Sequence, residues 1–316
     1  MSESLSAAER RPLDLRAVAL VMLLCLIWGV QQVAMKGIAT DVPPVMQLAM
    51  RFGLASIFFA IWVLAREGRA AFVDGTLPSG VLLGLLFSLE FIFMGQALNH
   101  TSAAHTIVFL YTAPIFTALG LRVLPEEHLS RLQWAGIGIA FLGIIVAFLG
   151  LGGRSALEIL IGDLLALLAG VSWGFSNVVL RRGRVGGSNT AKTVLYQVAT
   201  AALLLGTFAA LTGQTRFAPS AAAVLGLAFQ TIIISIVSYL VWFWLLRRYL
   251  ISRLMLLSLL TPLFGVMFGA AFLKDPISLR FSVGTGLVLA GVLVVNLELL
   301  RRPQPRLIAS AGRVKM

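Results

Sequence analysis

Polar side chains that could bind a small solute occur within apolar stretches of the sequence. Gln31 and Gln32 follow Trp28 by about one helical turn, and Asn177 follows Trp173 in the same way. Amides within apolar helices can bind an ammonium or a carboxylate through neutral hydrogen bonds, or they can connect neighbouring helices. We predict substrate contacts for Gln31 and Asn177, and the connecting role stays open for all three.

Two opposite charges, Arg51 and Glu90, also fall inside apolar stretches. Counting from the predicted helix ends places both at equal depth, roughly 10 Å below the same surface. An isolated charge costs about 2.5–3.5 kcal/mol at the centre of a membrane helix, so we predict a structural salt bridge between them. The alternatives are that Arg51 binds a substrate carboxylate or that Glu90 exchanges a proton. His105 is a further candidate for protonation, although a single histidine is more often part of a hydrogen-bonded structure.

Aromatic side chains accompany these polar groups. We predict that the following residues line a binding cavity, where they would contact an aromatic ligand: Trp28, Phe87, Phe91, Tyr111, Trp173 and Tyr239. The alternatives are anchoring at the membrane interface for Trp and Tyr, and contact with lipid for Phe.

Enzyme chemistry finds little support in the sequence. It contains no phosphate-binding loop of the P-loop type, no Gly-x-Ser-Gly sequence and no cysteine–histidine cluster. The single cysteine, Cys25, excludes an intramolecular disulfide. We therefore predict no catalytic residues, no metal and no cofactor.

The composition indicates that helices in a membrane must position these residues. Hydrophobic residues make up 59% of the chain, charged residues 12%, and the mean hydropathy is +0.95; a soluble domain has roughly 25% charged residues. The predicted class is therefore an all-α integral membrane protein with about ten transmembrane helices. We place them near 17–36, 44–66, 78–97, 102–123, 131–150, 157–182, 190–212, 220–246, 251–273 and 280–299.

The basic residues that give the net charge of +12 are distributed unevenly between the two sides of the predicted membrane helices. If the N-terminus is inside, 19 of the 25 Lys and Arg residues lie in inner segments and five in outer ones. The positive-inside rule then predicts that both termini are cytoplasmic. The excess of basic residues indicates contact with anionic membrane lipid and not with nucleic acid.

The sequence also contains an internal repeat. The stretch Trp28–Lys36 returns as Trp173–Arg181, 145 residues later. The sequence Pro114-Ile115-Phe116 returns as Pro262-Leu263-Phe264, 148 residues later. The same offset of 148 relates Glu126–Glu127 to Lys274–Asp275, and it relates Gly136, Gly138 and Gly143 to Gly284, Gly286 and Gly291.

Each half holds about five helices, and an odd number requires the second half to be inverted in the membrane. We predict two five-helix repeats, 17–150 and 157–299, around a central cavity, with tails at 1–16 and 300–316. Pro114 and Pro262 are predicted to kink their helices and act in gating. The glycines predict close helix packing, with a homodimer contact as one option.

The paired Trp-Gly sequences, the Pro-hydrophobic-Phe steps and the acidic residues before Gly-x-Gly helices resemble the EamA-type drug/metabolite transporter family. The loop Ala97-Leu98-Asn99-His100-Thr101-Ser102-Ala103 is similar to the family's loop between helices three and four. The resemblance is strongest to the YddG branch, whose members export aromatic amino acids across the inner membrane. It implies a multi-pass inner-membrane exporter that works by alternating access on a small amphipathic metabolite, with aromatic amino acids as the first candidates. The alternatives are a proton-coupled multidrug or nucleotide-sugar carrier, an uncoupled facilitator and, least favoured, an intramembrane enzyme.

Overall fold

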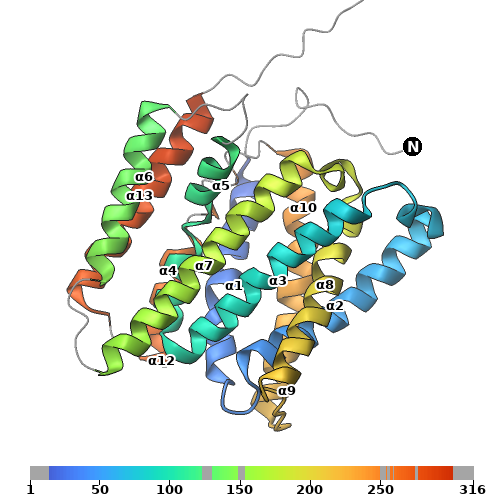
Figure 1. The fold of residues 1–316 in the computed structure, drawn as a ribbon, viewed down its shortest axis with the longest axis horizontal. Coiled ribbons are helices and arrows are strands. Elements are labelled where there is room, and N and C mark those ends of the chain that lie inside the picture. The colour runs from blue at the N-terminus through green and yellow to red at the C-terminus, as the bar shows by residue number, and fades with distance from the viewer. Residues whose placement is uncertain are drawn as a thin grey trace, which may run out of the picture.

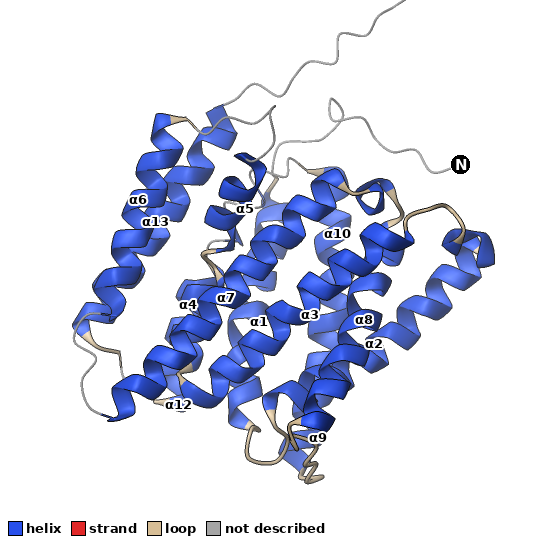
Figure 2. Cartoon of the chain, in the orientation of Figure 1, coloured by secondary structure: helices blue, strands red, loops and turns tan. Residues whose placement is uncertain are grey.

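The computed structural model describes residues 14–122, 130–148, 154–249, 254, 257–258, 260–274 and 277–301. These residues form helices joined by short turns (Figure 2). In the first half of the chain the main helices are α1 (Leu15–Gly37), α2 (Pro44–Glu67), α3 (Leu77–His100), α4 (Ala103–Leu110), α5 (Ala113–Arg122) and α6 (Arg131–Phe148). In the second half they are α7 (Arg154–Arg182), α8 (Thr190–Leu211), α9 (Ala221–Ala228), α10 (Tyr239–Arg248), α12 (Thr261–Leu273) and α13 (Leu279–Arg301). The short helices η2 (Arg69–Phe72) and η3 (Arg184–Gly187) lie in loops, and the π-helical segment η4 (Phe229–Ser238) joins α9 to α10.

The predicted spans correspond closely to these helices, with a difference in the fourth span. The fourth span is not continuous, because α4 ends at Leu110 and α5 begins at Ala113. Pro114 is therefore in the first turn of α5, and Pro262 is in the first turn of α12. Proline is tolerated there because the first amide groups of a helix have no partner within it. The predicted kink inside a continuous helix is thus wrong for Pro114, and a role of either proline in gating stays a prediction.

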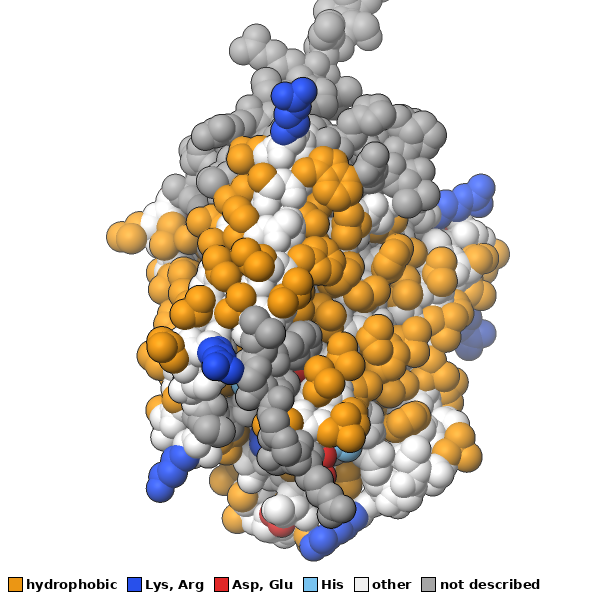
Figure 3. Space-filling view, turned by 60° about the vertical axis from the view of Figure 1, so that its left-hand side comes forward, with side chains coloured by type: hydrophobic (Ala, Val, Ile, Leu, Met, Phe, Trp, Pro, Cys, Tyr) orange, Lys and Arg blue, Asp and Glu red, His pale blue; other side chains and the backbone are white. Residues whose placement is uncertain are grey.

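Six of the described helices are long and apolar enough to cross a membrane, and four shorter apolar helices accompany them. Many large apolar side chains on their outer faces are exposed, such as Ile61, Leu142 and Leu225. On the face drawn in the space-filling view, apolar side chains cover much of the described surface (Figure 3). The molecule is therefore a multi-pass membrane protein. The tails and the acidic residues Glu126, Glu127 and Asp275 lie largely or wholly outside the described residues.

The helices pack in pairs that match between the halves. Helix α6 lies along α13 at one side of the molecule, and α2 lies along α8 near the other side (Figure 1). Helix α1 packs against α12, and the corresponding helix of the second half, α7, packs against α4 and α5. In the same way α3 contacts α7, and η4 with α10 contacts α1. These main contacts of one half thus have counterparts in the other.

The α6–α13 contact depends on two glycines at the repeat offset. A Cβ added at Gly143 would lie 2.6 Å from the backbone nitrogen of Val288, and one at Gly291 would lie 2.5 Å from that of Ala140. These positions confirm the predicted close packing. The prediction is wrong for Gly138 and Gly286, because an added Cβ meets no atom within 4 Å at either position. The homodimer contact stays a prediction.

Candidate functional site

The two repeated sequence motifs meet across the halves. An added Cβ at Gly29, which follows Trp28, would lie 2.8 Å from Cβ of Phe264, the last residue of the second Pro-x-Phe sequence. An added Cβ at Gly174, which follows Trp173, would lie 2.7 Å from Cβ of Phe116 in the first. At each Trp-Gly sequence the glycine lacks a side chain and so leaves a flat surface on its helix. The helix that carries the Pro-x-Phe sequence of the other half packs against this surface.

The two tryptophans have different neighbours. Trp28 donates a hydrogen bond from Nε1 to Oγ of Ser238 at 3.0 Å, and its ring packs edge-on against Trp242 with centroids 5.3 Å apart. Trp173 packs edge-on against Tyr111 with centroids 5.2 Å apart, at the break between α4 and α5. Both tryptophans are half-buried, and Tyr111 is buried. All three are thus at contacts between the halves, as a site between the halves requires.

The predicted amides divide between two surroundings. Asn177 donates to Oγ1 of Thr117 at 3.2 Å, which connects α7 to α5. Gln32 is buried and donates to Sδ of Met94 at 3.7 Å, whereas its Oε1 has no hydrogen-bond partner in the described part of the chain. Gln31 is buried and faces the guanidinium of Arg51. Asn177 therefore connects two helices, and its contact with substrate stays a prediction. The two glutamines lie near Arg51 and Met94 in a buried polar cluster.

Arg51 is the centre of that cluster. Its side chain on α2 is completely buried. With the Gln31 amide oriented so that its oxygen faces Arg51, Oε1 accepts from Nη1 at 3.1 Å and from Nη2 at 3.2 Å. The guanidinium carbon also lies 4.6 Å from the ring centre of Phe52 and 5.2 Å from that of Phe91, which is within cation–π range.

Glu90 lies on α3 next to Phe91 and is 6% exposed. The salt bridges formed by the described residues join His105 to Asp163 and Lys192 to Asp74, and the predicted pair of Arg51 and Glu90 is not among them. The helix ends explain part of this error. Arg51 is seven residues from the start of α2, but α3 continues to His100, ten residues beyond Glu90. At about 1.5 Å per residue the two depths differ by several ångströms.

Three phenylalanines form a cluster of rings at Arg51. The rings of Phe52, Phe87 and Phe91 have centroids 4.6–5.3 Å apart and all three are buried. Tyr239 is half-buried, packs against the main core and lies within electrostatic range of Arg51 and Glu90. The predicted residues Phe87, Phe91 and Tyr239 are thus brought together around Arg51.

The segment η4 supplies a group of polar side chains that sequence reasoning missed. Gln230 is fully buried and donates to Oε1 of Gln47 at 2.8 Å, while its own Oε1 has no partner in the described part of the chain. Thr231 and Ser235 are also buried, and neither hydroxyl oxygen has a partner there. π-helical turns inside α-helices are frequent at functional sites. Only a break in the 3.6-residue periodicity could have indicated this segment.

Further polar contacts join the helices at one end of the bundle. Asp163 accepts from Oγ1 of Thr101 at 2.7 Å and lies 2.8 Å from Nδ1 of His105. The His105 ring is stacked on Phe281 with centroids 3.8 Å apart, and Lys36 contacts the carbonyl of Thr101. His105 thus has a structural partner on α7 that its position in the sequence did not reveal.

At the opposite end, Asp14 accepts from the amide of Ala17 at 2.7 Å and from Tyr249 at 2.9 Å, connecting α1 to the end of α10. These bonds lower the pKa of the Asp14 carboxyl below its ordinary value, the bond from the Ala17 amide contributing most.

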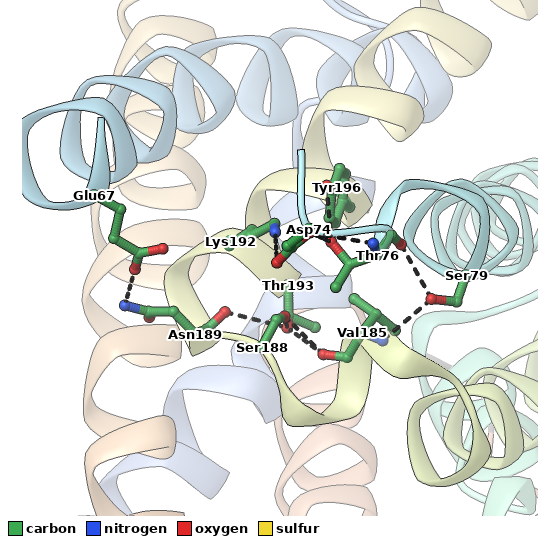
Figure 4. Close-up of polar contacts among 10 residues, drawn as sticks. All are labelled: Glu67, Asp74, Thr76, Ser79, Val185, Ser188, Asn189, Lys192, Thr193 and Tyr196. Carbon is green, nitrogen blue, oxygen red and sulfur yellow. Dashed lines mark hydrogen bonds and ion pairs between the residues drawn. The ribbon is translucent and has the colours of Figure 1, made fainter. Parts of the chain in front are cut away.

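The loop between α2 and α3 also joins the second half at this end (Figure 4). Lys192 is 1% exposed and forms a salt bridge of 2.5 Å with Asp74, which also accepts from Thr76 at 2.7 Å. These bonds lower the pKa of Asp74 to about 2, with the Lys192 bond the main cause. Ser79 accepts from the amide of Val185 at 3.1 Å, so η3 is joined to α3 as well. The described residues contain no group of three His, Cys, Asp or Glu that could hold a metal ion.

An all-helical bundle of apolar spans, built from two matched halves and holding a buried polar cluster, is typical of a multi-pass membrane transporter. The chain belongs to the EamA-like transporter family, whose model matches residues 15–149 and 160–297. The two matched stretches correspond to the two halves of the repeat.

Individual relatives agree with this family. The chain is 27% identical over 290 residues to a protein of Escherichia coli (strain K12) named "Probable amino-acid metabolite efflux pump", covering 87% of this chain and 93% of the relative. It is 23% identical over 286 residues to the "Uncharacterized transporter YoaV" of Bacillus subtilis (strain 168), covering 88% and 95%. A crystal structure with 22% identity matches the fold with a TM-score of 0.63, covering 90% of this chain and 98% of the other.

Proposed function

We propose that the protein is a secondary exporter of amino acids or closely related metabolites, with aromatic amino acids as the preferred substrates. The observation that carries this proposal is the buried cluster around Arg51, Gln31 and Glu90, which lies among the rings of Phe52 and Phe91 and within electrostatic range of Tyr239 from the second half. A relative named as an amino-acid metabolite efflux pump supports the same substrate class. The assignment to the YddG branch is part of this proposal.

Transport proceeds by alternating access between two inverted five-helix repeats. The reciprocal packing of Gly29 on Phe264 and of Gly174 on Phe116 supports this arrangement, because a two-fold axis in the membrane plane would generate both contacts from one. Rotation of one half against the other would slide these flat glycine contacts. The break between α4 and α5, just before Pro114, allows these helix ends to move separately, and Pro262 holds the matching position in the first turn of α12.

The exporter lies in the inner membrane with both termini in the cytoplasm. The bias of Lys and Arg toward one set of loops supports this orientation. In that case the contacts of Asp14 with Tyr249 and of Asp74 with Lys192 are at the cytoplasmic end, and the contact of Asp163 with His105 is at the outer end.

Uptake into liposomes that contain the purified protein tests the substrate class. We expect labelled phenylalanine or tryptophan to be taken up faster than labelled alanine, and faster than by liposomes without protein. Repeating the measurement with an imposed pH gradient separates proton coupling from facilitated exchange. Uptake of a cationic drug or a nucleotide sugar in place of amino acids would replace this function with another of the same family.

A further inference from the structure

The buried cluster contains two opposite charges that are not paired with each other. Arg51 is completely buried and Glu90 nearly so, yet no nitrogen of Arg51 lies within 4.0 Å of a carboxylate oxygen of Glu90. Nε of Arg51 and Oε2 of Glu90 have no hydrogen-bond partner in the described part of the chain. Direct pairing would be the least costly arrangement for two charges inside a membrane protein. Both groups therefore retain hydrogen-bonding capacity that the fold itself does not use.

The surroundings orient the guanidinium of Arg51 without neutralising its charge. The oxygen of Gln31 accepts from both terminal nitrogens of Arg51, and the rings of Phe52 and Phe91 contact the guanidinium. These contacts orient the guanidinium but bring no negative charge to it. Beside Gln31 on α1, Gln32 contacts Met94, one turn along α3 from Glu90, and its Oε1 is a further buried acceptor without a partner in the described part of the chain.

The chemistry of these groups selects one kind of ligand. A guanidinium N–H binds a carboxylate, and a carboxylate with a nearby amide oxygen binds an ammonium. A cationic drug would use Glu90 and leave Arg51 without a counter-charge. A nucleotide sugar would bring two negative phosphates to one arginine and place them near Glu90. Only a molecule that carries both charges side by side satisfies both residues.

We propose that Arg51 binds the α-carboxylate, and Glu90 with Gln32 the α-ammonium, of a free amino acid. Tyr239 lies within electrostatic range of both charges, and Trp28 bonds to Ser238, the residue before Tyr239. We assign contact with the amino-acid side chain to these two rings. This assignment rests on the proposed amino-acid export and names the residues that recognise its substrate.

A competition series with the wild-type protein tests the proposal without any mutation. Uptake of labelled phenylalanine into proteoliposomes is measured against unlabelled phenylalanine, phenylalanine amide, 3-phenylpropionate and 2-phenylethylamine. Each analogue that lacks one charged group should compete roughly 10- to 100-fold less well, because a hydrogen bond to a charged group is lost. Equal competition by all four would overturn the proposal and leave the transport function intact. No uptake of phenylalanine would remove the proposed function itself.

Variants assign the two charges to their residues. Arg51→Gln should abolish the advantage of phenylalanine over phenylalanine amide, and Glu90→Gln should abolish its advantage over 3-phenylpropionate. Arg66→Gln and Glu158→Gln are matched controls, because Arg66 stacks over Trp62 on the outside of the molecule and Glu158 is exposed. Both controls should keep the wild-type order of competitors.

A purely structural role gives a different result. It predicts that Arg51→Glu and Glu90→Arg each fold poorly and that the double swap recovers the yield of monodisperse protein. That recovery would overturn the proposal. If Arg51→Gln does not fold, Arg51→Lys keeps the charge without the Nε–H donor. It should weaken phenylalanine competition and leave 2-phenylethylamine unchanged, and an equal loss for both would count against carboxylate binding.

Discussion

Adding one methyl group at the α6–α13 contact should separate these helices. An added Cβ at Gly143 lies 2.6 Å from the nitrogen of Val288 and 2.7 Å from the carbonyl oxygen of Gly284, and one at Gly291 lies 2.5 Å from the nitrogen of Ala140. These are backbone atoms, so they cannot rotate away from the new methyl group. Because non-bonded carbon contacts are favourable only near 3.5 Å, the helices must move apart by about 1 Å.

The expected change in the free energy of unfolding is the difference between two opposing effects. Overpacking costs about 1–3 kcal/mol, whereas replacing glycine by alanine within a helix returns about 1 kcal/mol. Gly143→Ala or Gly291→Ala should therefore destabilise the protein by roughly 0–2 kcal/mol. The double variant should lose less than the sum, because one displacement of the helices relieves both contacts.

Gly138→Ala and Gly286→Ala are the controls on the same two helices, since an added Cβ at either position meets no atom within 4 Å. They should leave the melting temperature unchanged or raise it. Melting temperatures are measured by scanning fluorimetry in one detergent. If Gly143→Ala and Gly138→Ala change the melting temperature in the same direction and to the same extent, the close approach of α6 and α13 is refuted.

Three further predictions concern orientation, substrate preference and pH. In a cysteine-free background, single cysteines at Asn99 and Gly187 should react oppositely with an impermeant maleimide in intact cells, and equal labelling would refute the inverted topology. Trp28→Ala or Tyr239→Ala should lower uptake of phenylalanine more than that of alanine at equal expression, because ring contacts contribute about 0.5–1.5 kcal/mol each; an unchanged substrate order would assign both rings to packing. The pKa of Asp74 in the folded protein is lowered to about 2. The Asp74 carboxylate therefore stabilises the fold at any pH above its ordinary pKa, and this stabilisation is lost only as the pH falls through about 2. Asp74→Asn should therefore lower the melting temperature equally at pH 5 and pH 8, and a loss confined to pH 8 would contradict the Lys192–Asp74 contact.

Much of the architecture follows from the sequence because hydropathy and repetition are strong signals in a membrane protein. Runs of about 20 apolar residues give the helices, and the offsets of 145 and 148 relate their packing partners. The contacts of Gly29 with Phe264 and of Gly174 with Phe116 could not be predicted from the sequence. A repeat offset does not say whether two motifs meet within one half or across the two halves.

The buried site was less predictable, because its arrangement depends on small axial shifts and on local backbone form. Pairing of Arg51 with Glu90 was predicted from equal depth, but α3 extends farther than its hydropathy indicates and Gln31 takes the guanidinium. The π-helical segment that presents Gln230 and Ser235 has no distinct composition. Interactions such as that of His105 with Asp163, 58 residues away, depend on packing and not on local pattern.

Exchange across the membrane tests whether a substrate is bound between two halves that open alternately. Proteoliposomes are loaded with unlabelled phenylalanine or with buffer, and initial uptake of labelled phenylalanine is measured at the same external concentration. An alternating-access carrier returns faster with substrate bound, so internal phenylalanine should accelerate uptake several-fold. Equal initial rates with and without internal phenylalanine, together with uptake that does not saturate, would instead indicate a channel and contradict the account.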